Sequence, residues 1–110
     1  MVLDCPQPRA LAEFYSRLLG LEITSDEGDW VTVGGPGLPR ISFQLAPDLR
    51  PPQWPDPERP QQLHLDFTVD DIEAAEEQVL ALGARRLPGE GDSWRVYADP
   101  AGHPFCLVWE

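Results

Sequence analysis

The sequence predicts an α+β fold in which two similar halves each contain a strand, a helix and three further strands. Two observations carry this prediction. An amphipathic helical segment occurs near residues 9–20 and again near 70–83, and a short strand follows each one. A polar turn then leads to a tryptophan, Trp30 or Trp94, after which a strand, a turn and a strand complete the half. Because the same order of elements occurs twice, both halves are expected to adopt one topology.

The first half, residues 1–46, is organised around one helix. Pro8 stands near the first helical position, and Gly20 stands where a C-terminal cap belongs. The apolar side chains recur at the spacing of one helix face, at Leu11, Phe14 and Leu18. The strands of this half are expected before the helix, at 21–24, from Trp30 onward and at 41–45.

The second half, residues 63–110, repeats this organisation. Its helix is expected to open with a capping box from Asp70 to Glu73 and to stop at Gly83. The apolar face of this helix consists of Ile72, Ala75, Val79 and Leu82. The strands are expected at 62–67, at 84–87 and on both sides of the turn within 94–109.

A proline-rich connector at residues 47–62 joins the halves. It contains six prolines, and such a segment is stiff and extended. Trp54 lies within it and is a candidate clamp over a neighbouring surface. Two arrangements stay open: the connector folds the second half onto the first, or it carries the second half across to another subunit.

Composition narrows the class of partner. The chain has 110 residues and a formal net charge of −11, so its surface repels phosphate backbones and anionic lipid. We therefore expect neither a nucleic acid nor a membrane as partner. No apolar run approaches the ~20 residues of a membrane span, and the first ten residues lack a secretion signal, so a cytoplasmic location is expected. Cys5 and Cys106 are expected to be reduced thiols, although whether they meet stays open.

The strand expected at 62–67, "QLHLDF", alternates apolar and polar side chains. One face consists of Leu63, Leu65 and Phe67. His64 and Asp66 project from the other face about 7 Å apart, at ~3.3 Å per residue. These two side chains are either a working site or the solvated side of a sheet.

Three segments resemble the vicinal oxygen chelate superfamily, which includes glyoxalase I, bleomycin-resistance proteins and extradiol dioxygenases. They are "LAEFYSRLLGLE" at 11–22, "HLDFTVDDIEAAEEQVLALGA" at 64–84 and "YADPAGHPFCLV" at 97–108, the last being similar to the closing turn and final strand of the family. The resemblance implies a glyoxalase-like fold of two βαβββ modules in a curved, incomplete mixed β-barrel. It also implies helices on the convex face, a ligand cup on the concave face and a homodimer.

The resemblance implies which side chains line the cup. In the strand at 41–45, Ser42 and Gln44 are expected to face the cup, while the other three side chains enter the core, namely Ile41, Phe43 and Leu45. In the last strand Cys106 has the same inward parity. His64 and Asp66 face the cup from the strand at 62–67.

Superfamily members with metal chemistry place one ligand on the first strand and one on the last strand of each module. Here His64 supplies a standard ligand, Gln44 supplies a neutral amide and Cys106 supplies a thiol. The offset between Trp30 and Trp94 places the fourth position just before Met1.

This ligand set is incomplete. We therefore predict no metal or other cofactor, with His64 as the ligand if a divalent metal is bound. In the other interpretation, His64 lines the cup and bonds Asp66, Gln44 or water.

Other residues also allow two interpretations. Arg95 shares a strand face with Tyr97 and either holds a ligand carboxylate at the cup or forms an interface salt bridge. Trp30 and Trp94 are expected as core anchors, with Trp30 also a candidate for the cup. Cys106 is either a small core residue or a nucleophile activated by a histidine. His103, in the "AGHP" turn, is expected to be exposed.

The function expected from the resemblance is binding of a small molecule in the cup, as in bleomycin-resistance relatives, without a complete metal site. The acidic charge favours cationic or aromatic guests. The alternative is a metal-dependent lyase, isomerase or dioxygenase that uses His64 with Gln44, Cys106 or waters. A third interpretation is a homodimeric partner that has lost its chemistry.

Overall fold

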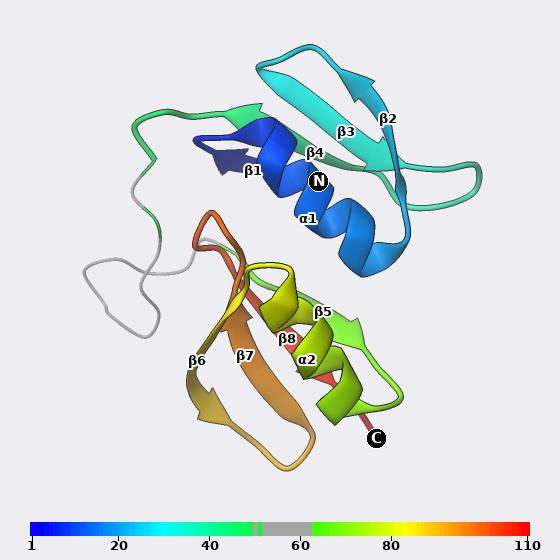
Figure 1. Cartoon of the computed structure of the whole chain (residues 1–110), viewed down its shortest axis with the longest axis vertical. Coiled ribbons are helices and arrows are strands. Elements are labelled where there is room, and N and C mark those ends of the chain that lie inside the picture. Colours follow the sequence, from blue (N-terminus) through cyan, green and yellow to red (C-terminus); the bar gives the residue numbers. More distant parts are fainter. Residues whose placement is uncertain (50, 52–62) are drawn as a thin grey trace. The chain divides into compact units, whose positions relative to one another are not determined.

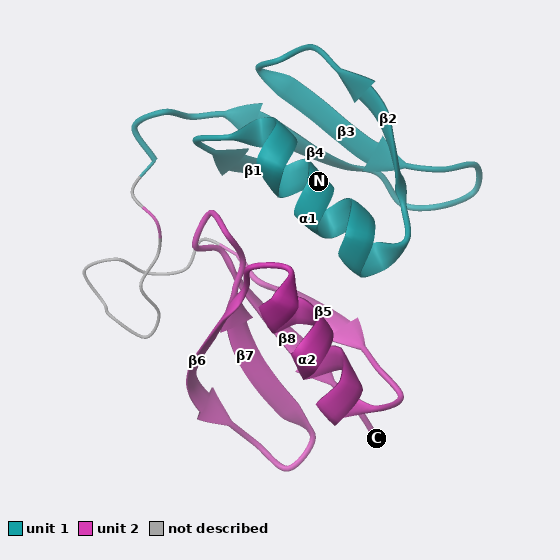
Figure 2. Cartoon of the chain, viewed as in Figure 1, with its two compact units in different colours: residues 1–49 teal, residues 50–110 magenta. Residues whose placement is uncertain are grey.

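The computed structural model describes residues 1–49, 51 and 63–110. They form two compact units, Met1–Leu49 and Arg50–Glu110, each with one helix and one four-stranded mixed sheet (Figure 1 and Figure 2). The predicted α+β class and the repeated order of strand, helix and three strands are thereby confirmed. Most of the predicted connector at 47–62, Trp54 included, lies outside the described residues. No described helix is both long enough and apolar enough to cross a membrane.

The first unit contains β1 (Val2–Cys5), α1 (Pro8–Leu19), β2 (Glu22–Asp26), β3 (Trp30–Gly34) and β4 (Ile41–Leu45). The strand order is β1-β4-β3-β2, with β1 parallel to β4 and the other neighbours antiparallel. Helix α1 ends as predicted at Gly20, whose φ of 69° is left-handed and suits glycine. Strand β2 runs two residues beyond the predicted 21–24, through a register irregularity in its pairing with β3.

The core of the first unit lies between α1 and the face of the sheet that this helix covers. Tyr15 of α1 stacks on Phe43 of β4 with ring centroids 5.6 Å apart. Ile41 and Phe43 are buried as predicted. Leu45 is 42% exposed, and its predicted place in the core is wrong because β4 ends at this residue.

The second unit contains β5 (Leu65–Thr68), α2 (Ile72–Ala81), β6 (Arg85–Glu90), β7 (Trp94–Ala98) and β8 (Pro104–Val108). The strand order is β5-β8-β7-β6, and β5 is parallel to β8. Strand β6 starts one residue later than the predicted strand at 84–87 and ends three residues later. A register shift between Arg86 and Glu90 extends its pairing with β7 to this later end. Burial alternates along residues 63–68 as the sequence predicts, with His64 and Asp66 on the exposed side.

Helix α2 begins one residue later than the predicted capping box implies. The Asp71 carboxylate accepts hydrogen bonds from the backbone N–H groups of Glu73, at 3.1 Å, and Ala74, at 3.2 Å. Asp71 is therefore the N-cap, and the predicted cap at Asp70 is wrong. Two consecutive aspartates fit the same sequence pattern, and in the structure Asp71 has the extended backbone and accepts the capping hydrogen bonds.

The core of the second unit lies between α2 and its sheet. Tyr97 of β7 stacks on Phe105 of β8 with ring centroids 5.5 Å apart, and Phe67 of β5 lies 5.9 Å from Phe105. Within α2 only Val79 is fully buried. This helix therefore contributes less apolar surface to its core than α1, which buries five residues.

Strand register relates the two sheets residue by residue. Trp30 lies opposite Gln44 in the first sheet, and Trp94 lies opposite Val108 in the second. The counterpart of Gln44 is therefore Val108, two residues beyond Cys106. The sequence interpretation that placed Gln44 and Cys106 at matching last-strand positions is wrong, because the pairing of neighbouring strands sets the equivalence.

Candidate functional site

A pocket of about 320 Å³ is present in the second unit. Its walls come from β7, β8, the start of β5 and the turn before β7, and consist of His64, Asp66, Ser93, Trp94, Val96, Cys106 and Val108. Along β7 these side chains alternate with Arg95 and Tyr97, which contact α2. Because successive side chains of a strand point to opposite faces, the pocket lies on the face of the sheet away from α2.

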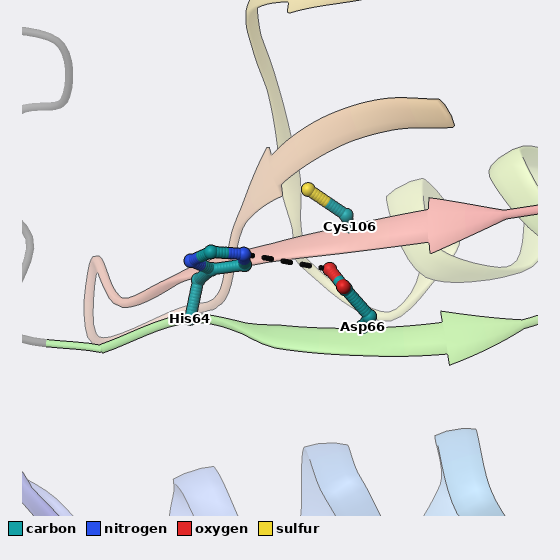
Figure 3. A group of neighbouring side chains, drawn as sticks. All are labelled: His64, Asp66 and Cys106. Carbon is teal, nitrogen blue, oxygen red and sulfur yellow. Dashed lines mark ion pairs between the residues drawn. The ribbon is translucent and has the colours of Figure 1, made fainter. Parts of the chain in front are cut away.

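Three polar side chains converge in this pocket. Asp66 of β5 lies opposite Cys106 of β8 in the parallel pair, and His64 precedes Asp66 by two residues on the same side. The imidazole Nε2 of His64 is 3.6 Å from Oδ1 of Asp66. Imidazole nitrogen, carboxylate oxygen and thiol sulfur all lie within 4.8 Å of one another (Figure 3). His64 and Asp66 lie on one face of the sheet, as the alternation predicts, and the thiol of Cys106 lies beside them.

The environment of Cys106 keeps its thiol protonated. Burial, the negative charge of Asp66 and a hydrogen bond to that carboxylate together raise the pKa of this thiol to about 11. A thiol with this pKa supplies very little thiolate near neutral pH. The protein alone therefore gives no support to the interpretation of Cys106 as an activated nucleophile.

Apolar side chains complete the pocket. Trp94 is 36% exposed and lines the pocket, which differs from its expected role as a core anchor. Val96 is buried and also lines the pocket, and Val108 lies opposite Trp94 on the neighbouring strand. The sequence interpretation missed all three residues as pocket walls. The internal repeat was the one sequence signal for Trp94 as a pocket residue, because Trp94 is the counterpart of Trp30, a candidate for the cup.

Two predicted cup residues belong to the first unit. Gln44 is exposed, Trp30 is half-buried, and they lie opposite each other on β4 and β3. The counterparts of Asp66 and Cys106 in this unit are found from the register and are Val2 and Ser42. The hydroxyl of Ser42 bonds that of Thr32 at 2.8 Å. At these equivalent positions the first sheet thus carries an apolar side chain and a neutral hydroxyl, where the second sheet carries the carboxylate of Asp66 and the thiol of Cys106.

Arg95 lies on the other face of the second sheet. Its guanidinium donates to Glu73 at 2.9 Å and to Glu76 at 3.2 Å, and it stands 5.7 Å from the centroid of the Trp109 ring. The expected place of Arg95 at the cup is wrong, since strand alternation directs its side chain to α2. Its salt bridges form within the unit, and its pKa is raised, first by the hydrogen bond to Glu73.

His103 is buried, with 3% of its surface exposed, so its expected exposure is wrong. One carboxylate oxygen of Asp99 accepts hydrogen bonds from the backbone N–H groups of Ala101, at 2.9 Å, and His103, at 3.0 Å. This bonding folds the "DPAGHP" turn inward, so the turn is an ordered part of the unit. It leads directly into β8, which carries Cys106.

Comparison with known proteins places this geometry in a family. A glyoxalase-like domain family model matches residues 1–108. The chain is similar to a glyoxalase/bleomycin resistance protein/dioxygenase family enzyme from Burkholderia phytofirmans PsJN, with 17% identity, a TM-score of 0.75 and coverage of 99% of this chain and 94% of that one. It is also similar to a glyoxalase-related enzyme from Fulvimarina pelagi, with 18% identity, a TM-score of 0.67 and coverage of 99% and 86%.

These identities are low, so the solved structures bear on the fold alone. None of the curated proteins compared with the chain matches it. The family model spans both units and nearly every residue, and it agrees with the resemblance to the vicinal oxygen chelate superfamily. The chain therefore belongs to the family of glyoxalase-like domains.

Proposed function

We propose that the pocket of the second unit binds a small organic molecule, with the apolar part of the guest against Trp94 and its polar part bonded by His64 and Asp66. The observation that carries this proposal is the convergence of three polar side chains in one largely apolar hollow. Its volume of about 320 Å³ lies within the ~300–1,000 Å³ typical of small-molecule sites.

The chemistry of the walls favours a cationic or hydrogen-bond-donating aromatic guest. Asp66 offers a carboxylate that accepts hydrogen bonds, and the chain carries a formal net charge of −11. The indole of Trp94 offers an exposed aromatic face, which attracts both aromatic rings and cations. An anionic guest meets the repulsion of this charge and gains no cation from the pocket walls other than a protonated His64.

Three probes that share one ring test the proposal: benzylamine, benzyl alcohol and benzoate. Binding is followed by NMR titration of the four indole N–H signals, with that of Trp94 assigned by its loss in Trp94→Ala. We expect benzylamine to shift the Trp94 signal at the lowest concentration and benzoate at the highest. Asp66→Asn should weaken benzylamine most and benzyl alcohol least.

Trp30→Ala is the matched control, because Trp30 begins the equivalent strand of the first unit. It should leave the titration unchanged, whereas Trp94→Ala should abolish saturable binding of all three probes, with the backbone amide signals of Val96 and Cys106 in the pocket as the readout for both variants. Equal loss of binding in the two variants would rule out this pocket as the site.

A second candidate function is metal-dependent lyase, isomerase or dioxygenase activity, and the family names of the solved relatives favour an enzyme. Its support in this chain is the presence of His64 and Cys106 in one pocket. Turnover of a hemithioacetal or a catechol, lost in His64→Ala, would establish it. If His64→Ala retains full turnover, the activity belongs to another site.

The setting we propose is a homodimer in the cytoplasm. Dimers of glyoxalase-like domains are implied by the family resemblance. Sedimentation equilibrium of the full chain tests this directly. A single species with the mass of one chain, about 12.3 kDa, at every concentration would contradict it.

A further inference from the structure

We propose that Gly91, in the turn before β7, is a positioning residue: it holds the indole of Trp94 at the pocket wall and thereby sets a preference of the pocket for aromatic over aliphatic guests. The preference rests on the guest binding proposed above, whereas the placement of the indole does not. Trp94 lines the pocket and Gly91 does not, so Gly91 acts through the indole and not through contact with the guest.

The turn brings the two residues together through the backbone. The N–H of Gly91 donates a hydrogen bond of 3.0 Å to the carbonyl of Trp94, which closes a hairpin with Asp92 and Ser93 at its tip. The N–H of Trp109, directly after β8, donates to the carbonyl of Ser93 at 3.0 Å. The hairpin is thereby tied to the neighbouring strand, and the backbone of Trp94 is fixed relative to Gly91.

The indole lies where a side chain of residue 91 would start. A Cβ atom on Gly91 would stand 2.7 Å from both Cδ1 and Cε2 of Trp94, and closer still to Nε1. Carbon atoms that are not bonded to each other are in favourable contact at ~3.5–4.0 Å. A Cβ atom and the indole therefore cannot both occupy this place, and the five-membered edge of the ring packs directly on the turn.

The backbone conformation itself does not call for glycine at this position. The φ of Gly91 is not positive, so residues with a side chain can adopt it. The three heavy atoms nearest to a Cβ at Gly91 all belong to Trp94. The close approach of the indole is thus what the missing side chain permits, and Gly91→Ala places its methyl group in conflict with that ring.

The first unit differs at this position. There the N–H of Glu27 donates to the carbonyl of Trp30 at 2.9 Å, and the N–H of Leu45 donates to the carbonyl of Asp29 at 2.8 Å. These are the counterparts of the two bonds in the second unit, so Glu27 is the counterpart of Gly91. Its Cβ fills the place that the indole takes in the second unit. The repeated turn therefore accommodates this indole position in the second unit only.

The support from Gly91 matters because the pocket does not enclose Trp94. This side chain is 36% exposed, and without the contact to the turn its indole is free to rotate about its own bonds. An aromatic guest gains attraction from a ring held at the wall, beyond the burial of its area. An aliphatic ring of the same size gains the burial only. A fixed indole therefore gives the pocket its preference between such guests.

NMR tests the placement of the indole without any guest. We expect a nuclear Overhauser effect between the indole N–H of Trp94 and an Hα of Gly91 in the parent chain. Gly91→Ala should shift the indole N–H signal of Trp94. Asp92→Ala, at an exposed position of the same turn, and Glu27→Ala, at the counterpart position, should leave it in place. Absence of the Overhauser effect, or an unmoved signal in Gly91→Ala, overturns the inference.

Benzylamine and cyclohexylmethylamine test the preference, because they share the ammonium group and differ in the aromaticity of the ring. Binding is followed by the backbone amide signals of Val96 and Cys106 in the pocket. The parent chain and Asp92→Ala should bind benzylamine ~2–10-fold more tightly than the aliphatic amine, and Gly91→Ala should reduce this ratio to near one. An equal ratio in Gly91→Ala and the parent chain overturns the inference and leaves the proposed function standing. If neither amine binds the parent chain although the Overhauser effect is present, the proposed function fails and the placement of the indole by Gly91 holds.

Discussion

The phenolic hydroxyl of Tyr97, on β7, donates a hydrogen bond of 2.8 Å to the carboxylate of Glu76, on α2. The same carboxylate forms salt bridges with Arg86 at 2.9 Å and Arg95 at 3.2 Å. The side chains of Glu76 and Arg95 are each only 17% exposed. Burial and, next, the hydrogen bond to Glu76 together raise the pKa of Tyr97 to about 12. Since α2 has one fully buried residue, this polar cluster is a main attachment of the helix to its sheet.

Glu76→Gln should lower the free energy of unfolding by about 1–3 kcal/mol, because the amide removes the charge that two arginines face. Urea unfolding followed by circular dichroism measures the change. Glu77→Gln makes the same chemical change one residue later, at an exposed position. It should alter the free energy by less than about 0.5 kcal/mol. Equal effects of the two variants would contradict the attachment described here.

The same cluster predicts a dependence on pH. Burial raises the pKa of Glu76, but the hydrogen bond from Tyr97 and the charges of Arg86 and Arg95 outweigh burial and leave the pKa below its ordinary value of 4.5. The folded state therefore binds this proton more weakly than the unfolded state. The ionised carboxylate stabilises the fold above about pH 4.5, and this stabilisation is lost as the pH falls through the lowered pKa.

The difference in unfolding free energy between the parent chain and Glu76→Gln should thus be constant from pH 7 to about pH 5 and shrink below about pH 4.5. Urea unfolding at pH 7, 5, 4 and 3 provides the comparison. A difference that stays constant down to pH 3 would show that Glu76 gains nothing from its arginine and tyrosine partners.

Val79 should dominate the apolar contribution of α2. Its side chain is fully buried, whereas the next residue, Leu80, is 43% exposed. Val79→Ala should cost about 2 kcal/mol through lost burial and a small cavity. Leu80→Ala removes more atoms but should cost less than about 0.5 kcal/mol. The two midpoints of urea unfolding decide between these expectations, and a larger shift for Leu80→Ala would mean that another surface covers the helix.

Local sequence signals predicted the elements well. The start of α1 at Pro8 and its end at Gly20 depend on residues within one turn, so they can be read without the rest of the chain. The alternation that places His64 with Asp66 is equally local, because the side-chain period of a strand fixes it. The choice between Asp70 and Asp71 as N-cap was not decided locally, since both fit the pattern.

Features that depend on pairing between distant segments could not be predicted. The equivalence of Gln44 with Val108 follows from strand register, which joins residues far apart in the chain. Alternation shows that Arg95 and Trp94 lie on opposite faces, yet it does not say which face α2 covers. From the sequence, Arg95 is a candidate for the cup and Trp94 is expected in the core, whereas in the structure Arg95 contacts α2 and Trp94 lines the pocket.

The turn before β8 should control the stability of the pocket strand. Asp99 is 2% exposed, and its carboxylate accepts two backbone hydrogen bonds, from Ala101 and His103. Asp99→Ala leaves both N–H groups without this acceptor and should cost about 2–3 kcal/mol. Asp92→Ala, in the exposed turn before β7, is the matched control and should cost less than about 0.5 kcal/mol.

Hydrogen exchange locates the effect of this substitution. Because the turn leads into β8 at Pro104, Asp99→Ala should speed exchange of the β8 amides, including that of Cys106, more than that of the β3 amides in the first unit. Uniform acceleration in both units would indicate global unfolding in place of local loosening. Unchanged exchange at Cys106 would show that the β5 and β7 ladders hold this strand without the Asp99 turn.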